Sequence, residues 1–234
     1  MAGAIAHHFN NKLQAVMMSL ELAIGDLVGN EDLGEDMTAA MLAAREAAEV
    51  SSLMLTYLGQ SVARREPLDL CIVCHNCLGL LRAVMPEGFT LQTDLPAPGP
   101  TICADANQIQ HVLANLVTNA WEASGDARGA IHLTVRTVGA ADIPVKHRFP
   151  IDYHPQDDAY ACLEVSDSSC GIEDHEIEKI FDPFFSSKFP GRGLGLAEAI
   201  GIARTHNGAI AVQSDLGRGS IFRVYLPIQL FADC

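Results

Sequence analysis

Three glycines at alternate positions, Gly191, Gly193 and Gly195, follow a lysine and lead through Leu196 into an apolar series with helical spacing. Glycine has no Cβ, so the backbone there can turn sharply and approach a ligand closely. The helix expected after Gly195 would present free N–H groups and the positive end of its dipole to whatever lies in the turn. The stretch is therefore a candidate phosphate-binding site. An ordinary loop-to-helix turn has the same local pattern, so this alternative stays open.

A second set of candidate ligands lies on a helix expected to begin after Asp105. Asn115, Asn119 and Glu122 recur at i, i+4 and i+7, so they share one face of that helix. Amide and carboxylate oxygens in such a row can hold a hard divalent cation. A solvated helix face would show the same row, and the pattern alone does not separate the two.

Two further side chains have the chemistry of a site. Asp167 follows an expected buried strand and stands near Gly171, where its carboxylate can accept a hydrogen bond from a ligand amine. Near the start of the chain, His7 and Asn11 lie four residues apart and share a helix face. Histidine titrates near neutral pH and its neutral imidazole is a nucleophile, but a lone surface histidine usually has no such role.

The residues around His7 belong to a helical pattern. Apolar residues recur at spacings of three and four from 4 to 27 and again from 37 to 62, until Pro67 forbids further helix. Two such helices bury only one stripe each. We therefore expect an antiparallel all-α helical hairpin that forms a four-helix bundle as a homodimer.

After Pro67 the pattern alternates between helices and strands. Asp105 is expected to cap a helix with Gln108 as its partner, and the Leu216–Gly219 stretch is typical of a hairpin. With no βαβ regularity, we expect a mostly antiparallel sheet with helices on one face, an α+β two-layer sandwich. The expected helices are 71–84, 106–121, 174–181 and the one after Gly195; the expected strands are 89–95, 131–138, 161–165, 209–214 and 220–226, with an exposed loop at 139–159.

Composition limits the class of protein. The chain has 234 residues, 49% of them hydrophobic, and a net charge of −14. It can bury a real core, and its apolar runs are interrupted well short of the about 20 residues that a membrane span needs. The first residues lack the features of a secretion signal, and the negative charge argues against nucleic acid. We expect a cytoplasmic protein with no nucleic-acid partner and no membrane segment in this fragment.

Seven cysteines in a chain without an export signal are expected to be reduced thiols. Cys71, Cys74 and Cys77 have a spacing of three that resembles half of a zinc or iron–sulfur site. They also fit the buried side of the helix at 71–84, and no fourth ligand lies nearby. We prefer the interpretation that they are small apolar core residues.

Four separated segments resemble, in order, the conserved boxes of sensor histidine kinases. AHHFNNKL resembles the phosphoacceptor box in its H-x-F-N-N form, and DANQIQHVLANLVTNAWEA the asparagine box; DSSCGI resembles the first glycine box, and FDPFFSSK with GRGLGLA the aromatic and second glycine boxes. The resemblance covers about residues 4–228. It implies that residues 1–66 are a dimerisation and histidine-phosphotransfer domain. Residues 67–234 would be a catalytic ATP-binding domain of the fold shared with gyrase, Hsp90 and MutL.

The resemblance also implies roles for single residues. His7 would be phosphorylated, and Asn11 would orient water when the phosphorylated partner is dephosphorylated. Asn119 would coordinate Mg²⁺, with Asn115 close to the same ion or the phosphates. Gyrase-like hydrolases carry a water-activating glutamate at the position of Asn115, so transfer to His7 is favoured over ATP hydrolysis.

The remaining implied roles concern ATP. Asp167 would bind the adenine amino group, and Gly171 would let the base approach. The phosphates would be held under a short lid by Lys188, Gly191, Arg192, Gly193, Gly195 and Leu196. The implied activity is ATP-dependent autophosphorylation of His7 and transfer to an aspartate of a response-regulator receiver domain. Only six residues precede His7, so the signal would come from an upstream sensor domain or a separate sensor protein.

Two positions depart from the family pattern. His8 stands where the family has Asp or Glu, from which we expect slow or pH-dependent autophosphorylation. Ser169 replaces the first glycine of its box, which would weaken nucleotide binding if that position needs a special backbone angle or close contact with adenine. These departures leave an alternative, a catalytically weak or inactive phosphotransfer or scaffold protein with a degenerate ATP site. An ATPase or chaperone-like machine is a third candidate, and Asn115 argues against it.

Overall fold

The structure is a computed structural model that describes residues 16–20, 37, 40–41, 44, 47, 64–125, 128–183, 185 and 193–228. The chain divides into two compact units, Met1–Ser61 and Val62–Cys234. In the first unit, the described residues 16–20, 37, 40–41, 44 and 47 are helical. The helical hairpin, its dimer and the domain boundary after residue 66 stay predictions, and His7, His8 and Asn11 lie outside the described residues.

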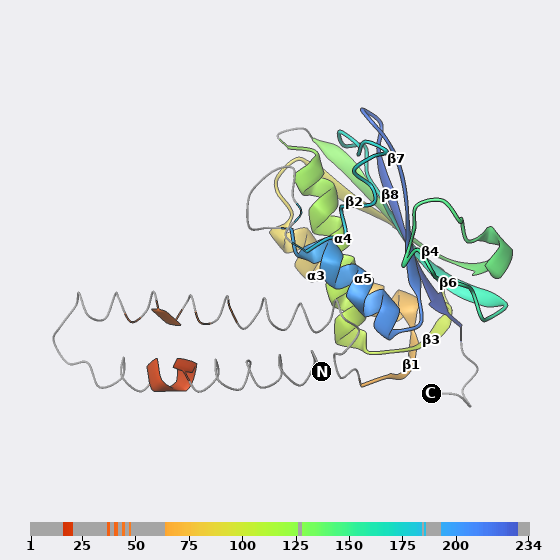
Figure 1. Ribbon diagram of the computed structural model, residues 1–234, viewed down its shortest axis with the longest axis horizontal. Helices are drawn as coiled ribbons and strands as arrows, with labels where there is room; N and C mark the ends of the chain where they lie inside the picture. The colour runs from red at the N-terminus through yellow and green to blue at the C-terminus, as the bar shows by residue number, and fades with distance from the viewer. Residues whose placement is uncertain are drawn as a thin grey trace. The chain divides into compact units, whose positions relative to one another are not determined.

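The second unit is an α+β two-layer sandwich, as predicted, with its helices on one face of a six-stranded sheet (Figure 1). The strand order is β2-β4-β6-β8-β7-β5; β2 pairs with β4 in parallel and the other neighbours are antiparallel. The helices are α3 (Leu70–Val84), α4 (Ala106–Ala123) and α5 (Gly195–Thr205); the strands are β1 (Glu66–Asp69), β2 (Phe89–Asp94), β3 (Thr101–Ala104), β4 (Gly129–Gly139), β5 (Arg148–Phe149), β6 (Ala159–Ser166), β7 (Ala209–Asp215) and β8 (Gly219–Pro227).

The core lies between α4 and the sheet. Leu113, Leu116 and Val117 of α4 are completely buried, as are Leu163 and Val165 of β6. Each such side chain stabilises the fold by about 1.5–3 kcal/mol relative to exposure. Because apolar residues take up one stripe of α4, its polar row containing Asn115 and Asn119 is left on another face of the helix.

The first turn of α4 is tied to the start of the unit. Asp105 is the N-cap, and its Oδ1 accepts hydrogen bonds from the backbone N–H groups of Asn107 (3.0 Å) and Gln108 (3.2 Å). Such a cap contributes about 1 kcal/mol. Its other oxygen, Oδ2, accepts from the backbone N–H of Arg64 at 3.0 Å. Arg65 donates through its guanidinium to the backbone carbonyl of Thr205, at the end of α5.

The two helix ends are also joined to each other. His206, which follows α5, is 4% exposed, and its Nε2 accepts a hydrogen bond from the backbone N–H of Asp105 at 3.0 Å. Its Nδ1 lies 2.9 Å from the carbonyl oxygen of Ile202 and therefore carries the proton. Burial lowers the pKa of His206, with a further lowering by the nearby Arg65. The neutral ring thus holds the start of α4 against the end of α5.

The prediction of a helix at 174–181 was wrong, and one small sheet was missed. Residues 174–181 form successive turns rather than a helix. Backbone carbonyls there accept hydrogen bonds from N–H groups three residues further along; the N–H of Glu176, for example, donates to the carbonyl of Glu173 at 2.9 Å. The following Asp182-Pro183 pair disfavours helical backbone. The small antiparallel sheet of β1 and β3 was not predicted.

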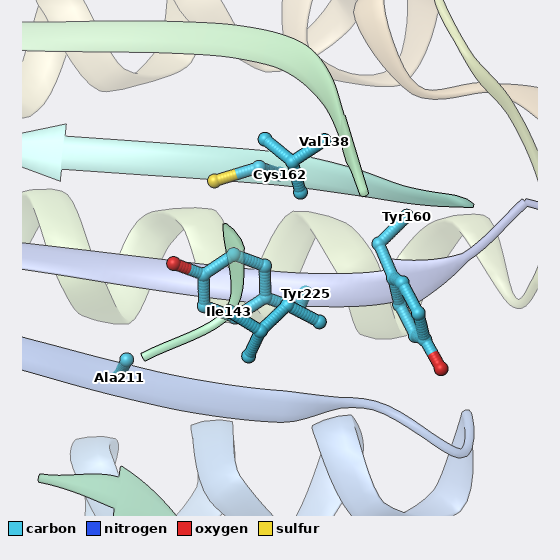
Figure 2. Close-up of a cluster of buried hydrophobic side chains, with 6 residues drawn as sticks. All are labelled: Val138, Ile143, Tyr160, Cys162, Ala211 and Tyr225. Carbon is cyan, nitrogen blue, oxygen red and sulfur yellow. The ribbon is translucent and has the colours of Figure 1, made fainter. Parts of the chain in front are cut away.

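The predicted exposed loop at 139–159 instead covers part of the sheet. It contains a 3₁₀ turn (Ala140–Asp142) and β5, and its Ile143 and Phe149 are buried. Figure 2 shows the apolar cluster that it shares with the sheet face turned away from the helices; its members are Val138, Ile143, Tyr160, Cys162, Ala211 and Tyr225. The hydroxyl of Tyr160 accepts from the N–H groups of Gln156 and Asp157, which fixes the loop. This second core was hidden in the sequence by the prolines and charges of the loop.

The cysteines of α3 are core residues, as preferred from the sequence. Cys71, Cys74 and Cys77 are buried free thiols, and burial raises the pKa of all three, that of Cys71 to about 11. Cys103 differs, because it is disulfide-bonded. The expectation that every cysteine is a reduced thiol was therefore wrong.

A membrane-spanning helix is not found in the part of the chain that the structure describes.

Candidate functional site

Asp167 follows β6, and only one of its two carboxylate oxygens accepts hydrogen bonds from the described residues. Its Oδ1 accepts hydrogen bonds from the backbone N–H groups of Ser169 (2.9 Å) and Ser220 (3.3 Å). Its own N–H donates to the carbonyl of Ser220 at 3.0 Å. The second oxygen, Oδ2, is buried and has no hydrogen-bond partner among the residues that the structure describes. A buried acceptor without a donor costs about 1–3 kcal/mol or more, so the side chain is fixed for a donor that the described residues do not supply.

The turn after Asp167 depends on Gly171. This residue has a φ of +72°, and a Cβ there would collide with the backbone carbonyl of Asp215. The carbonyl of Cys170 accepts from the N–H of Gly217 at 2.6 Å, and the N–H of Ile172 donates to Ser214 Oγ at 2.8 Å. The turn at 167–172 is therefore bonded along its length to the hairpin between β7 and β8.

Ser169 does not require glycine geometry. Among the described non-glycine residues, only His147 and Asn207 have a positive φ. The weakening of the site through a special backbone angle, considered from the sequence, therefore has no basis in the structure. The side chain of Ser169 is 7% exposed, and its hydroxyl has no hydrogen-bond partner in the described part of the chain.

A second group of polar residues joins α4 to the first turn of α5. Asn115 Nδ2 donates to Glu198 Oε2 at 2.8 Å, and His111 Nδ1 lies 3.3 Å from Glu198 Oε1. A carboxylate only accepts, so it fixes which end of the amide faces it. The amide oxygen is turned toward Gly195, where a Cβ would stand 3.2 Å from Asn115 Oδ1. Asn119 lies one turn further along α4 and is half-buried.

Glu198 was not predicted as a site residue. The only signal in the sequence was its place three residues after Gly195, since an acidic residue in the first turn of a helix is usually explained by the helix dipole. Its contact with Asn115 depends on how α4 and α5 pack, which the spacing of residues along either helix does not reveal.

The start of α5 has the features expected of an anion site. The helix begins at Gly195, and its N-cap residue, Leu194, makes no side-chain capping bond. The N–H groups of the first turn are therefore not occupied by a side chain at the N-cap position. Gly193, Gly195 and Leu196 lie at this end. Lys188, Gly191 and Arg192 lie outside the described residues, and their contacts with phosphate stay predictions.

The second unit matches a family of known proteins. Residues 104–230 match the family described as histidine kinase-, DNA gyrase B-, and HSP90-like ATPase. The matched range runs from the residue before the N-cap of α4 to just beyond β8, and so contains Asn115, Asp167 and Gly195.

Curated relatives extend the similarity over nearly the whole chain. Sensor kinase CckA of Brucella abortus is 33% identical over 229 residues, which are 97% of this chain and 24% of the relative. Sensor protein FixL of Bradyrhizobium diazoefficiens is 30% identical over 234 residues, which are 97% of this chain and 43% of the relative. The chain thus spans less than half the length of these relatives.

Solved structures show the same fold. Full-length ShkA in complex with AMPPNP has a TM-score of 0.68 and 22% identity, and covers 97% of this chain and 45% of its own. The catalytic domain of histidine kinase ThkA has a TM-score of 0.53 and 27% identity, and covers 70% of this chain and 96% of its own.

Proposed function

Because the chain belongs to the histidine kinase-, DNA gyrase B-, and HSP90-like ATPase family, we propose that it is the catalytic core of a sensor histidine kinase. It binds ATP in the second unit and transfers the γ-phosphoryl group to His7. The observation that carries this proposal is the buried, unpartnered Oδ2 of Asp167. It matches the need of an adenine amino group for an acceptor, and a degenerate site would have no reason to keep it.

The bound nucleotide would extend from Asp167 to the start of α5. The adenine amino group donates to Asp167, and the turn that Gly171 permits forms the wall beside the base. The phosphates lie at the N-terminus of α5, where the N–H groups of the first turn and the helix dipole favour negative charge. Gly191, Gly193, Gly195 and Leu196 shape the backbone there, and Lys188 and Arg192 supply positive charge.

The donor set on α4 fits Mg²⁺, which prefers oxygen ligands. Glu198 binds the nitrogen of the Asn115 amide and leaves its oxygen for a cation, and Asn119 presents a second amide on the same side of α4. When bound, Mg²⁺ neutralises the charge that develops on the phosphates. Positioning and charge neutralisation are the main needs of phosphoryl transfer, so these residues supply what the reaction requires.

The proposed phosphorylation of His7 rests on the sequence. The imidazole of neutral His7 attacks the γ-phosphorus, the bond to ADP breaks, and a phosphohistidine forms. His8 acts as the neighbouring base in place of the usual carboxylate. The box is of the H-x-F-N-N type, in which Asn11 orients water for dephosphorylation of the partner.

The partners follow from the same proposal. The phosphoryl group passes from His7 to an aspartate of a response-regulator receiver domain. The helical hairpin dimerises, and an upstream sensor domain or a separate sensor protein supplies the signal. The cores act in the cytoplasm. The similarity to sensor kinases along 97% of the chain supports these assignments.

Incubation with γ-labelled ATP and Mg²⁺ tests the proposal. We expect acid-labile label on the wild-type chain and none on His7→Gln, while both bind ATP. Release of phosphate without label on the protein would indicate an ATPase instead. Absence of ATP binding by the wild type would support the scaffold alternative.

A further inference from the structure

We propose that Ser169 is a second base-recognition residue, whose hydroxyl accepts a hydrogen bond from the same amino group that donates to Asp167. This inference rests on the proposed ATP site and adds a residue that determines its specificity. The family pattern has glycine at this position, so the contact would be a property of this chain.

The first observation is that Ser169 Oγ is buried without a partner. Its side chain is 7% exposed, and Oγ shares this state with Oδ2 of Asp167, two residues away. Other buried hydroxyls behave differently: Thr205 Oγ1 donates to the carbonyl of Gly201 at 3.0 Å, and Ser220 Oγ lies 3.0 Å from Ser214 Oγ. Within the described ranges, Ser169 is the buried serine or threonine whose hydroxyl lacks a hydrogen-bond partner.

The second observation is that the surrounding turn is fixed. The N–H of Ser169 donates to Asp167 Oδ1, and the carbonyl of the next residue, Cys170, accepts from Gly217. Ser214 Oγ is engaged by Ile172, Gly219 and Ser220. These polar groups of the turn and the hairpin thus already have partners. The hydroxyl of Ser169 is unpaired for the same reason as Asp167 Oδ2, namely that both are placed for a ligand.

The chemistry of the missing ligand follows from the two oxygens. Both can accept a hydrogen bond, and they stand on one turn, so a group with two N–H donors satisfies both. A primary aromatic amino group, as in adenine, is such a group. A base with a carbonyl oxygen at that position, as in guanine or hypoxanthine, would place this acceptor against the Asp167 carboxylate, which can only accept. Such mismatches strongly disfavour binding, because buried polar groups are then left unpaired.

The test compares ATP with purine riboside 5′-triphosphate, which has hydrogen in place of the amino group. The variants are Ser169→Ala and Ser169→Gly, and the matched control is Ser168→Ala, which removes an exposed hydroxyl from the same turn. Affinity is measured on the full chain by displacement of a fluorescent ATP analogue. Thermal unfolding without nucleotide checks that each variant folds. The backbone N–H of residue 169, which bonds Asp167, is kept in all of them.

We expect the wild type and Ser168→Ala to prefer ATP over the analogue by the same factor. In Ser169→Ala that factor should fall about three- to tenfold, as expected for one hydrogen bond. An unchanged factor, or equal weakening of both nucleotides, would overturn the inference even if Asp167→Asn abolishes binding. A wild type that binds neither nucleotide would overturn the ATP site itself, and the inference with it.

Discussion

Asn115 on α4 and Glu198 on α5 are joined by a hydrogen bond of 2.8 Å between Nδ2 and Oε2. This bond has two effects: it connects the helix that carries the proposed cation ligands to the helix whose N-terminus would hold phosphate, and it sets the direction of the amide oxygen. Asn115, for which the family resemblance implies the position of a water-activating glutamate in gyrase-like hydrolases, is thus accompanied by a carboxylate from another helix.

Removing Glu198 should reduce the effect of Mg²⁺ on ATP affinity. In Glu198→Ala the amide of Asn115 can rotate, so its oxygen is no longer held toward the proposed site. We expect the ratio of ATP affinities with and without Mg²⁺ to fall about three- to tenfold, as measured by calorimetry. His111→Ala keeps the Asn115 bond and serves as control. An undiminished ratio in Glu198→Ala would show that the bond does not orient a ligand.

Asp167→Asn should weaken ATP binding while preserving the fold. The substituted amide can keep its oxygen on the N–H groups of Ser169 and Ser220, and its NH₂ group would then face the adenine amino group. We expect a loss of about ten- to a hundredfold in affinity, the size of a hydrogen bond to a charged group. Unfolding by urea should be little changed. Wild-type affinity in this variant would place adenine elsewhere.

Gly171→Ala should destabilise the second unit more than Gly217→Ala. Both glycines have a positive φ, +72° and +77°, which costs an alanine about 1–2 kcal/mol. Only at Gly171 does a Cβ meet backbone, whereas at Gly217 nothing lies within 4 Å. We expect the additional clash to cost about 1–3 kcal/mol, measured by denaturant unfolding. Equal losses in the two variants would contradict this account of the turn.

Stability should fall with acidity because of His206. Its folded-state pKa is lowered from 6.5, chiefly by burial and also by Arg65, while Asp105 acts in the opposite direction. Below about pH 6.5 the unfolded chain binds a proton that the folded chain does not, so stability decreases as pH falls through this window. Above it, the group contributes no pH dependence. Protonation would also remove the acceptor for the N–H of Asp105.

The measurement is denaturant unfolding at pH 8.0, 6.5 and 5.5. His206→Gln can still accept from Asp105 and should lose less stability on acidification than the wild type. His132→Gln, at an exposed position of β4, should behave as the wild type does. An identical acid loss in His206→Gln would assign the effect to other groups.

His8→Asp should speed autophosphorylation, most clearly below pH 7. A carboxylate beside His7 can stabilise the positive ring that forms on phosphoryl transfer, which a second histidine cannot do. The measurement is the rate of label incorporation from γ-labelled ATP across a pH series, with His7→Gln as the blank. A large fall in rate would mean that His8 has a role of its own.

The sequence was sufficient to predict the elements whose apolar residues recur with a clear helical or strand period. The stripe of α4 from Ile109 to Ala120 and the cap at Asp105 could be read directly, because helix spacing and capping are local properties. The turn at Gly217 was also local, since its glycines demand a hairpin. The candidates Asn115, Asp167 and Gly195 were selected from local patterns of the same kind, namely a helix face, a strand end and a glycine-rich turn, and their roles in ATP binding stay predictions.

The rest depended on contacts between distant segments. Glu198 became part of the site only because α5 packs on α4, and the unpaired oxygens of Asp167 and Ser169 arise from the hairpin that fixes their turn. The loop at 139–159 carries prolines and charges along its length, yet Ile143 is buried against β6 and β8. None of these relationships has a period along the chain, so spacing alone could not reveal them.

The bonds at Arg64 and Arg65 have a mechanical consequence. These two residues lie near the start of the second unit, and they form hydrogen bonds to the first turn of α4 and the last turn of α5. A displacement of the backbone at Arg64 and Arg65 would therefore either break these hydrogen bonds or move the first turn of α4 and the last turn of α5, the helices that carry Asn115 and Gly195. Movement at Arg64 and Arg65 would thus be transmitted through α4 and α5 to the place where the phosphates are expected.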